Sequence, residues 1–290
     1  MMKNIPKWLL YSIYILVATV FFIYYLFPSD KVKNYVTSGF NKLNSNINIR
    51  IDHVSPAFPP GLTLYKVSFY HMDNTLIEFE QIKIVPNLLS FFRSKKIFFF
   101  KGGAYKGVLD GKGAFIKDRP EKNVVIEGKF SNINIKEIPA VKPFVGRNLT
   151  GILGGNFTYR NGGKLGGISE AKFIISDGNV ELLTPVFKLK DVYFSKIEAD
   201  VTMENKRVKV KRCIINASPM DGNVSGLINL REPFGQSYLR LLGVIKPNQE
   251  FLAELGKDFP TNLLPKEIVN KRVVRIRIYG TLDEPRFFLD

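Results

Sequence analysis

The chain has 290 residues, 45% of them hydrophobic, and a formal net charge of +16. This apolar content can build a sizeable core and excludes a mainly disordered chain. The single cysteine, Cys213, excludes an intrachain disulfide and any CxxC redox or zinc motif, and we interpret it as a small residue of a sheet. The positive charge suits anionic lipid headgroups or a solvated basic face. We expect no nucleic acid partner, because no basic helix or aromatic nucleic-acid motif occurs.

The first feature along the chain is an apolar stretch of 20 residues, Trp8 to Phe27, that contains no charged residue. As a helix it would be about 30 Å long, which is the thickness of the hydrocarbon core of a bilayer. Residues typical of membrane interfaces mark its ends, with Trp8 and Tyr11 at one end and Tyr24 and Tyr25 at the other. We predict a membrane anchor rather than a cleaved signal peptide, whose apolar region would be shorter.

The orientation of this anchor does not follow from the flanking lysines. Lys3 and Lys7 precede it, and Lys31, Lys33 and Lys42 follow it, so neither side has a clear excess of positive charge. Long domains are often translocated whatever their charge. We therefore expect residues 1–29 to be a cytoplasmic tail and membrane helix, and about 260 residues to lie across the membrane.

Residues 30–45 are predicted to form a juxtamembrane amphipathic helix. Val32, Val36 and Phe40 recur at helical spacing on one face. Asp30 is predicted to cap the helix, because its carboxylate can accept hydrogen bonds from the free amides of the first turn. The apolar stripe would suit a helix that lies on the membrane surface, and equally a helix that covers the start of the next domain.

Residues 46–290 follow the period of two that is typical of strands. Apolar and polar residues alternate in tracts such as 197–203, 207–211 and 274–279. Because successive side chains of a strand point to opposite faces, each tract has one apolar and one polar side. About 16 such tracts follow one another. We predict a mainly β fold, in which a long, twisted, largely antiparallel sheet carries a few short helices at residues 87–96, 136–145 and 248–258.

Turn-forming residues separate these tracts. Asp110-Gly111, Asp177-Gly178, Glu204-Asn205-Lys206 and Asp221-Gly222 are predicted hairpin turns. The sequence Asp-Gly-Asn-Val at 177–180 returns at 221–224, as expected where a sheet grows by adding hairpins, although such short turns also recur by chance. Glycines between residues 101 and 167 leave open a subdivision near Gly163, but strand-like residues run through this interval.

The sequence offers little catalytic chemistry. His53 and His71 each lie near a carboxylate, but a metal or acid–base site would need more convergent groups. The glycine-rich stretch at 107–113 lacks the spacing of a phosphate-binding loop and its Ser or Thr. We therefore predict that the chain is not an enzyme and holds no cofactor.

Several segments together resemble a known family. The N-terminal anchor is followed by PAFPPGLTLYKVSF at 56–69, by VPNLLSFFRSKK at 85–96 and by GGAYKGVLDGKG at 102–113. This arrangement resembles the type II secretion system protein N family of diderm bacteria. The second half of the chain, including RIRIYGTLDEPRFFL at 275–289, resembles the wider AsmA and TamB superfamily.

The resemblance implies a single-pass protein of the bacterial inner membrane whose bulk is periplasmic. Such a protein would present a long apolar groove to phospholipid, or would serve a secretion apparatus as a structural subunit that contacts partner proteins. An ordinary packed core made from the same side chains is the third possibility. The residues predicted to line a lipid groove are Ile197, Val201, Val208, Val210, Val274, Ile276 and Ile278.

Overall fold

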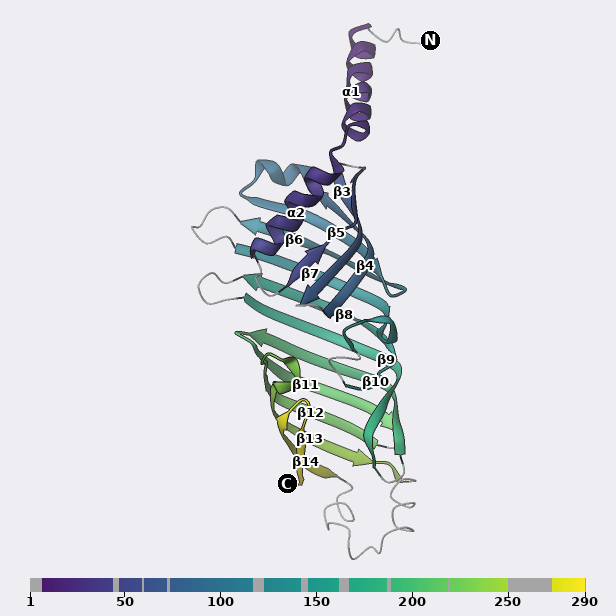
Figure 1. Cartoon of the computed structure of the whole chain (residues 1–290), viewed down its shortest axis with the longest axis vertical. Coiled ribbons are helices and arrows are strands. Elements are labelled where there is room, and N and C mark those ends of the chain that lie inside the picture. Colours follow the sequence, from purple (N-terminus) through teal and green to yellow (C-terminus); the bar gives the residue numbers. More distant parts are fainter. Residues whose placement is uncertain are drawn as a thin grey trace, which may run out of the picture.

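The structure is a computed structural model that describes residues 7–43, 47–58, 60–71, 74–116, 123–141, 146–161, 167–186, 189–218, 220–249 and 273–289. It consists of an apolar N-terminal helix, a second helix and one long antiparallel sheet (Figure 1). The predicted mainly β fold is confirmed.

The described elements follow one another in a simple order. The two helices are α1 (Lys7–Tyr25) and α2 (Ser29–Leu43). The strands are β1 (Asn48–Arg50), β2 (His53–Ala57), β3 (Gly61–His71), β4 (Asn74–Pro86), β5 (Lys95–Ala104), β6 (Gly107–Ile116), β7 (Asn123–Asn134), β8 (Ile152–Asn161), β9 (Gly167–Val186), β10 (Leu189–Glu204), β11 (Arg207–Ser218), β12 (Met220–Asn229), β13 (Tyr238–Pro247), β14 (Val274–Thr281) and β15 (Pro285–Leu289). Short 3-10 helices are η1 (Leu88–Phe92), η2 (Ile135–Glu137) and η4 (Phe234–Gln236).

The first helix, α1, is long and apolar enough to cross a membrane, and none of its side chains is buried in the protein. Its end corrects the predicted span, which extended to Phe27. The helix stops at Tyr25, and the Phe27 side chain packs instead against the buried core of the sheet. Pro28, which follows, has no amide hydrogen with which to continue the helix. The candidate span is therefore Lys7–Tyr25.

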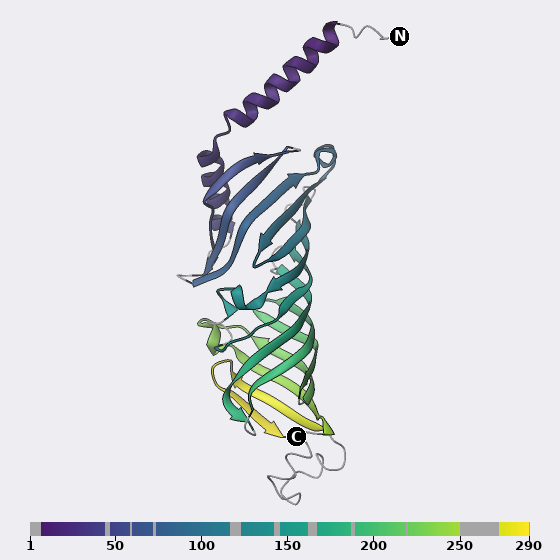
Figure 2. The same cartoon turned by 90° about the vertical axis from the view of Figure 1, so that its right-hand side faces the viewer.

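The strands form one open sheet. Each strand from β3 to β14 pairs with the next strand along the chain, always antiparallel. β1 and β2 both pair with β3 and together form one edge, and β15 forms the other. Figures 1 and 2 show a long, twisted ribbon of strands that extends away from α1. The described residues contain 15 strands, close to the predicted number of about 16, and 14 of them lie side by side, which at the usual strand spacing spans about 60 Å.

The sheet continues through the interval where a subdivision was left open. β8 and β9 pair along their lengths, from Ile152 opposite Ser176 to Asn161 opposite Gly167. Gly163 itself lies outside the described residues, as do parts of the segments 136–145 and 248–258 for which short helices were predicted. The segment 87–96 forms the five-residue 3-10 helix η1 and then enters β5.

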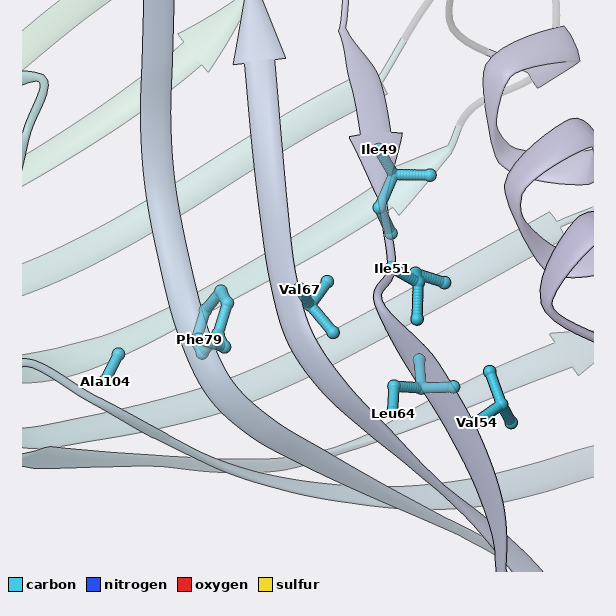
Figure 3. Packing of buried hydrophobic residues seen from close by; sticks show 7 residues of the cluster. All are labelled: Ile49, Ile51, Val54, Leu64, Val67, Phe79 and Ala104. Atoms are coloured by element: carbon cyan, nitrogen blue, oxygen red, sulfur yellow. The ribbon is translucent and has the colours of Figure 1, made fainter. Parts of the chain in front are cut away.

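The second helix, α2, covers the first strands of the sheet. Its side chains Val32, Val36 and Phe40 pack against a cluster of buried residues. The members of this cluster are Ile49, Ile51, Val54, Leu64, Val67, Phe79 and Ala104 (Figure 3). Of the two roles left open by the sequence, the apolar stripe of α2 therefore serves as a cover for the domain.

Polar contacts fasten α2 to these strands. The Ser29 hydroxyl donates to the Val54 carbonyl oxygen at 2.6 Å, and the Asn41 side-chain oxygen accepts from the Ile49 amide at 3.0 Å. The predicted capping role of Asp30 is wrong, because the helix begins at Ser29 and Asp30 lies inside its first turn. There its exposed carboxylate is 3.7 Å from the Lys33 ammonium.

The predicted turns are only partly correct. Glu204-Asn205-Lys206 is a hairpin turn, in which Asn205 and Lys206 both have positive φ, as a tight two-residue hairpin requires. Asp110-Gly111 and Asp177-Gly178 are wrong, because they lie inside β6 and β9. Asp221-Gly222 likewise belongs to β12. The glycines at 111 and 178 are needed for close packing across the sheet, so the Asp-Gly-Asn-Val repeat does not mark two turns.

Candidate functional site

The candidate site is one face of the sheet, which we call the apolar face. It is the face on which α2 lies and to which Val67 and Phe79 belong. In an antiparallel sheet, residues directly opposite each other on neighbouring strands point to the same face. The strand register therefore shows which side chains share this face from one end of the sheet to the other.

The register brings together all seven residues that were predicted to line a groove. Val201 lies opposite Val210, which lies opposite Gly226, and the row continues through Leu241 to Ile278. Two neighbouring rows run beside it, in which Val208 lies opposite Met203 and Ile276 lies opposite Gly243. A further row of opposite residues begins at Ile197 and continues through Ile215, Gly222 and Ile245 to Val274. All seven side chains are half-buried.

A bulge in β11 keeps these rows on one face. Asp200 lies opposite Arg212, but Val201 lies opposite Val210, so β11 contains one extra residue at this point. Without it, the alternation of β11 would place either Val210 or Cys213 on the opposite face. The bulge thus allows the exposed residues Lys211 and Arg212 to follow each other while the apolar face remains continuous.

The apolar face carries no charge over most of its length. Among the described residues from Phe98 in β5 to Leu289 in β15, the register places only apolar or uncharged side chains on it. The opposite face, which we call the polar face, carries ion pairs between strands: Lys112 on β6 and Glu127 on the neighbouring β7 are 3.1 Å apart, and Lys211 on β11 reaches across β10 to Glu170 on β9 at 3.7 Å. A hydrogen bond from Lys196 lowers the pKa of Glu198 on this face. From Phe98 onward the charged residues of the register therefore lie on the polar face, and Lys96, opposite Phe115 at the start of β5, is a charged residue on the apolar side.

The apolar face is covered at one end and uncovered at the other. α2 lies over β1–β4, where the buried cluster is found. From β10 to β15, the buried hydrophobic residues among those described are Phe194, Ala199 and Leu239. The remaining apolar side chains here stay accessible, and Phe287 and Leu289 on β15 are 64% and 63% exposed. Within the described part of the chain, no element packs over this end of the face.

Glycines opposite aromatic rings flatten the middle of the apolar face. A side chain at Gly113 would meet the Phe98 ring, one at Gly128 would meet the Phe157 ring, and one at Gly178 would meet the Phe194 ring, all within 2.5 Å. Each ring therefore lies over the glycine opposite it, where a Cβ atom would otherwise stand. Rings in this position cover the backbone and project less from the sheet than upright side chains would.

Cys213 lies on the apolar face, between Ala199 on β10 and Val224 on β12. Burial raises the pKa of its thiol above the ordinary value. The thiol is therefore protonated at neutral pH, and the residue acts as a small apolar side chain of the sheet, as predicted.

The remaining predicted groups lie near the N-terminal end. In α1, Trp8, Tyr11 and Tyr25 are exposed, whereas Tyr24 is half-buried. The His53 ring is 3.2 Å from the Ser29 hydroxyl and packs near Tyr65. The described residues contain no group of three His, Cys, Asp or Glu side chains that could hold a metal ion.

Comparisons with known proteins do not assign the chain to a family. No family model, curated protein or solved structure matches the chain.

Two features of the structure were not anticipated from the sequence. The pairing of glycines with aromatic rings becomes visible only in the strand register, because the partners are up to 29 residues apart, as for Gly128 and Phe157. The exposure of the segment LLSFF in η1 was also missed, since the sequence predicted only a short helix at 87–96. The basic residues directly after it were the available signal.

Proposed function

We propose that this protein binds lipid acyl chains on the apolar face of its sheet while α1 holds it in a membrane. The observation that supports the proposal is that the register places no charged residue on this face from Phe98 in β5 to Leu289 in β15, together with its lack of cover beyond β10 among the described residues. A water-exposed apolar face of this length is unfavourable, and each methylene group that it buries contributes roughly 0.8 kcal/mol. Even part of one acyl chain would therefore bind with measurable affinity.

The membrane we propose is the bacterial inner membrane, with the sheet in the periplasm. The resemblance of the sequence to the type II secretion system protein N family and to the AsmA and TamB superfamily supports this location. α1 supports a single-pass anchor by its length and composition. A fusion of alkaline phosphatase to the C-terminus tests the topology, because that enzyme is active only after export; an inactive fusion beside a fluorescent cytoplasmic fusion would contradict it.

Site-specific photocrosslinking in cells tests the binding of lipid. Benzoyl-phenylalanine placed at Val210 or Ile276, on the apolar face, should yield lipid adducts that mass spectrometry detects. The matched control is Leu242 on β13, which is 56% exposed and lies opposite Arg277 on the polar face. The readout is the difference in lipid adduct yield between the two positions, because a nonspecific encounter with lipid would label both. Equal adduct yields at Val210 and Leu242 would contradict the proposal.

A second function is favoured by a different observation, the open edge of the sheet at β15. Among the described strands β15 pairs only with β14, and three of its four exposed residues, Phe287, Phe288 and Leu289, are apolar, the fourth being Arg286. An unpaired edge of this kind can add a strand from another protein. The protein would then be a structural subunit of a secretion apparatus without lipid cargo. Protein adducts from a photocrosslinker at Phe288, with no lipid adducts at Val210, would favour this function.

A further inference from the structure

An exposed apolar cluster lies at the end of the sheet next to α1. Four side chains of η1 contribute to it: Leu88, Leu89, Phe91 and Phe92, of which Leu89 is 73% and Phe92 is 92% exposed. The turn between β2 and β3 contributes Phe58, which is 76% exposed. We call these five residues the apolar tip.

The strand register places both parts of the apolar tip at the same end of the sheet. β2 ends where β3 begins, with Ala57 opposite Gly61, and this end of β3 lies beside the last residues of β4, from which η1 follows. The Lys83 ammonium on β4 donates to the Phe58 carbonyl oxygen at 3.0 Å and joins the two segments. The start of α2 is here as well, since Ser29 bonds to Val54 on β2.

This end of the sheet faces α1. Figures 1 and 2 show η1, drawn in blue, at the same end of the molecule as the junction between α1 and α2, and Figure 2 shows α1 leaning over that end. A membrane crossed by α1 would therefore lie directly against the apolar tip.

The η1 segment is held so that its apolar side chains point outward. Ser90 is its buried residue; its hydroxyl donates to the Asn87 carbonyl at 2.6 Å and accepts from the Ile97 amide at 2.9 Å. The Lys96 ammonium donates to the carbonyl oxygens of Phe91 and Arg93. A loop fixed by its polar groups in this way cannot fold its four large side chains back onto the sheet. These hydrogen bonds therefore keep the four apolar side chains exposed.

Basic residues border the apolar tip. Arg93 and Lys95 are exposed directly after η1, and Lys83 lies beside Phe58. Apolar side chains flanked by Lys and Arg are the composition that binds the interface of a bilayer with anionic headgroups. A protein partner would explain the apolar residues, but it would not explain why they lie beside the membrane helix.

We propose that the apolar tip is a second membrane contact, which inserts into the headgroup region of the same bilayer that α1 crosses and so fixes the sheet relative to that bilayer. The partner of the apolar tip is therefore the lipid surface. The inference does not depend on lipid binding at the apolar face, because it uses only α1, η1 and the β2–β3 turn.

Fluorescence tests this contact in the full chain. Trp8 is the only tryptophan, so Trp8→Phe provides a background without tryptophan emission. Phe92→Trp then reports on the apolar tip, and Phe288→Trp on β15 is the matched control at the opposite end of the sheet. Both reporters replace exposed phenylalanines, so neither should disturb folding. The variants are reconstituted into vesicles of phosphatidylcholine and phosphatidylglycerol that contain lipid brominated along the acyl chain.

The Phe92→Trp reporter should emit at shorter wavelength than the Phe288→Trp reporter and should lose most of its intensity to the brominated lipid. Lipid brominated near the headgroup should quench it more than lipid brominated near the bilayer centre. The result does not depend on the orientation of the protein, because both leaflets contain the quencher. A Phe92→Trp reporter with the emission and quenching of the control would overturn the proposal and would favour a protein partner for the apolar tip.

Discussion

The two ends of the sheet share one sequence pattern but differ in whether another element covers their apolar face. At the N-terminal end, the face lies beneath α2, and Val54 and Val67 are completely buried. At the C-terminal end, Val208 and Val210 occupy the same kind of position in alternating strands but remain half-exposed. Alternation of apolar and polar residues thus defines the two faces of a sheet, whereas the presence of a covering element decides whether a face is a core.

The largest expected difference between the two ends concerns stability. Leu64→Ala removes a buried side chain from the cluster beneath α2 and should reduce the local free energy of unfolding by about 2–5 kcal/mol. Leu241→Ala, at a half-buried position of the apolar face on β13, should cost clearly less because this site has no cover. Hydrogen exchange of the amides in β3 and β13 measures both effects. Equal losses would show that the C-terminal end is also a closed core.

A smaller loss of stability is expected at a glycine of the apolar face where the backbone leaves no room for a side chain. Gly226 on β12 has φ +142°, and a Cβ atom there would come within 2.3 Å of the Arg240 carbonyl oxygen on β13. Gly226→Ala should therefore destabilise the C-terminal strands by about 1–3 kcal/mol. Gly222→Ala is a control on the same strand and face, since the nearest atom to its added Cβ is 3.8 Å away. Similar stability of the two variants in denaturant titrations would argue against strain at Gly226.

The smallest effect concerns the reactivity of Cys213, which lies within the uncovered part of the apolar face. Because burial raises the pKa of this thiol, its alkylation rate should keep increasing at a pH where an exposed thiol is already ionised. If lipid covers the face, removal of lipid by detergent exchange should also increase the rate. Maleimide labelling followed by mass spectrometry measures both trends; a rate that does not change with lipid content would indicate that the face near Cys213 is empty.

The sequence predicted those parts of the fold that depend on local periodicity. The uncharged stretch at 8–27, the helical stripe of α2 and the alternation in β10–β15 each reflect which neighbours a side chain meets within one element. The Asp-Gly turns failed because a positive φ also occurs inside a strand, as at Asp177, and because the glycines there make room for rings on the next strand. That requirement depends on register, which a single sequence does not reveal.

Local periodicity also predicted which residues of the candidate site share a face. The seven groove residues share one face because each of their tracts alternates strictly, whereas the bulge at Lys211, which keeps the rest of β11 on that face, was not visible in the sequence. The apolar tip was missed for a different reason: the four neighbouring apolar side chains of η1 predict burial, and only the structure shows that hydrogen bonds of Ser90 hold the segment with these side chains exposed.

The order of strands has a consequence for how the chain acquires its structure. From β3 to β14 each strand pairs with its immediate successor, so the strand contacts join segments that are neighbours along the chain. Sheets with such local contacts fold quickly compared with those that must join distant segments. The strands beneath α2 are synthesised first and can form a nucleus, onto which each later hairpin adds as soon as it is available. A sheet of this kind can also be lengthened or shortened by whole hairpins without changing the pairing of the strands already in place.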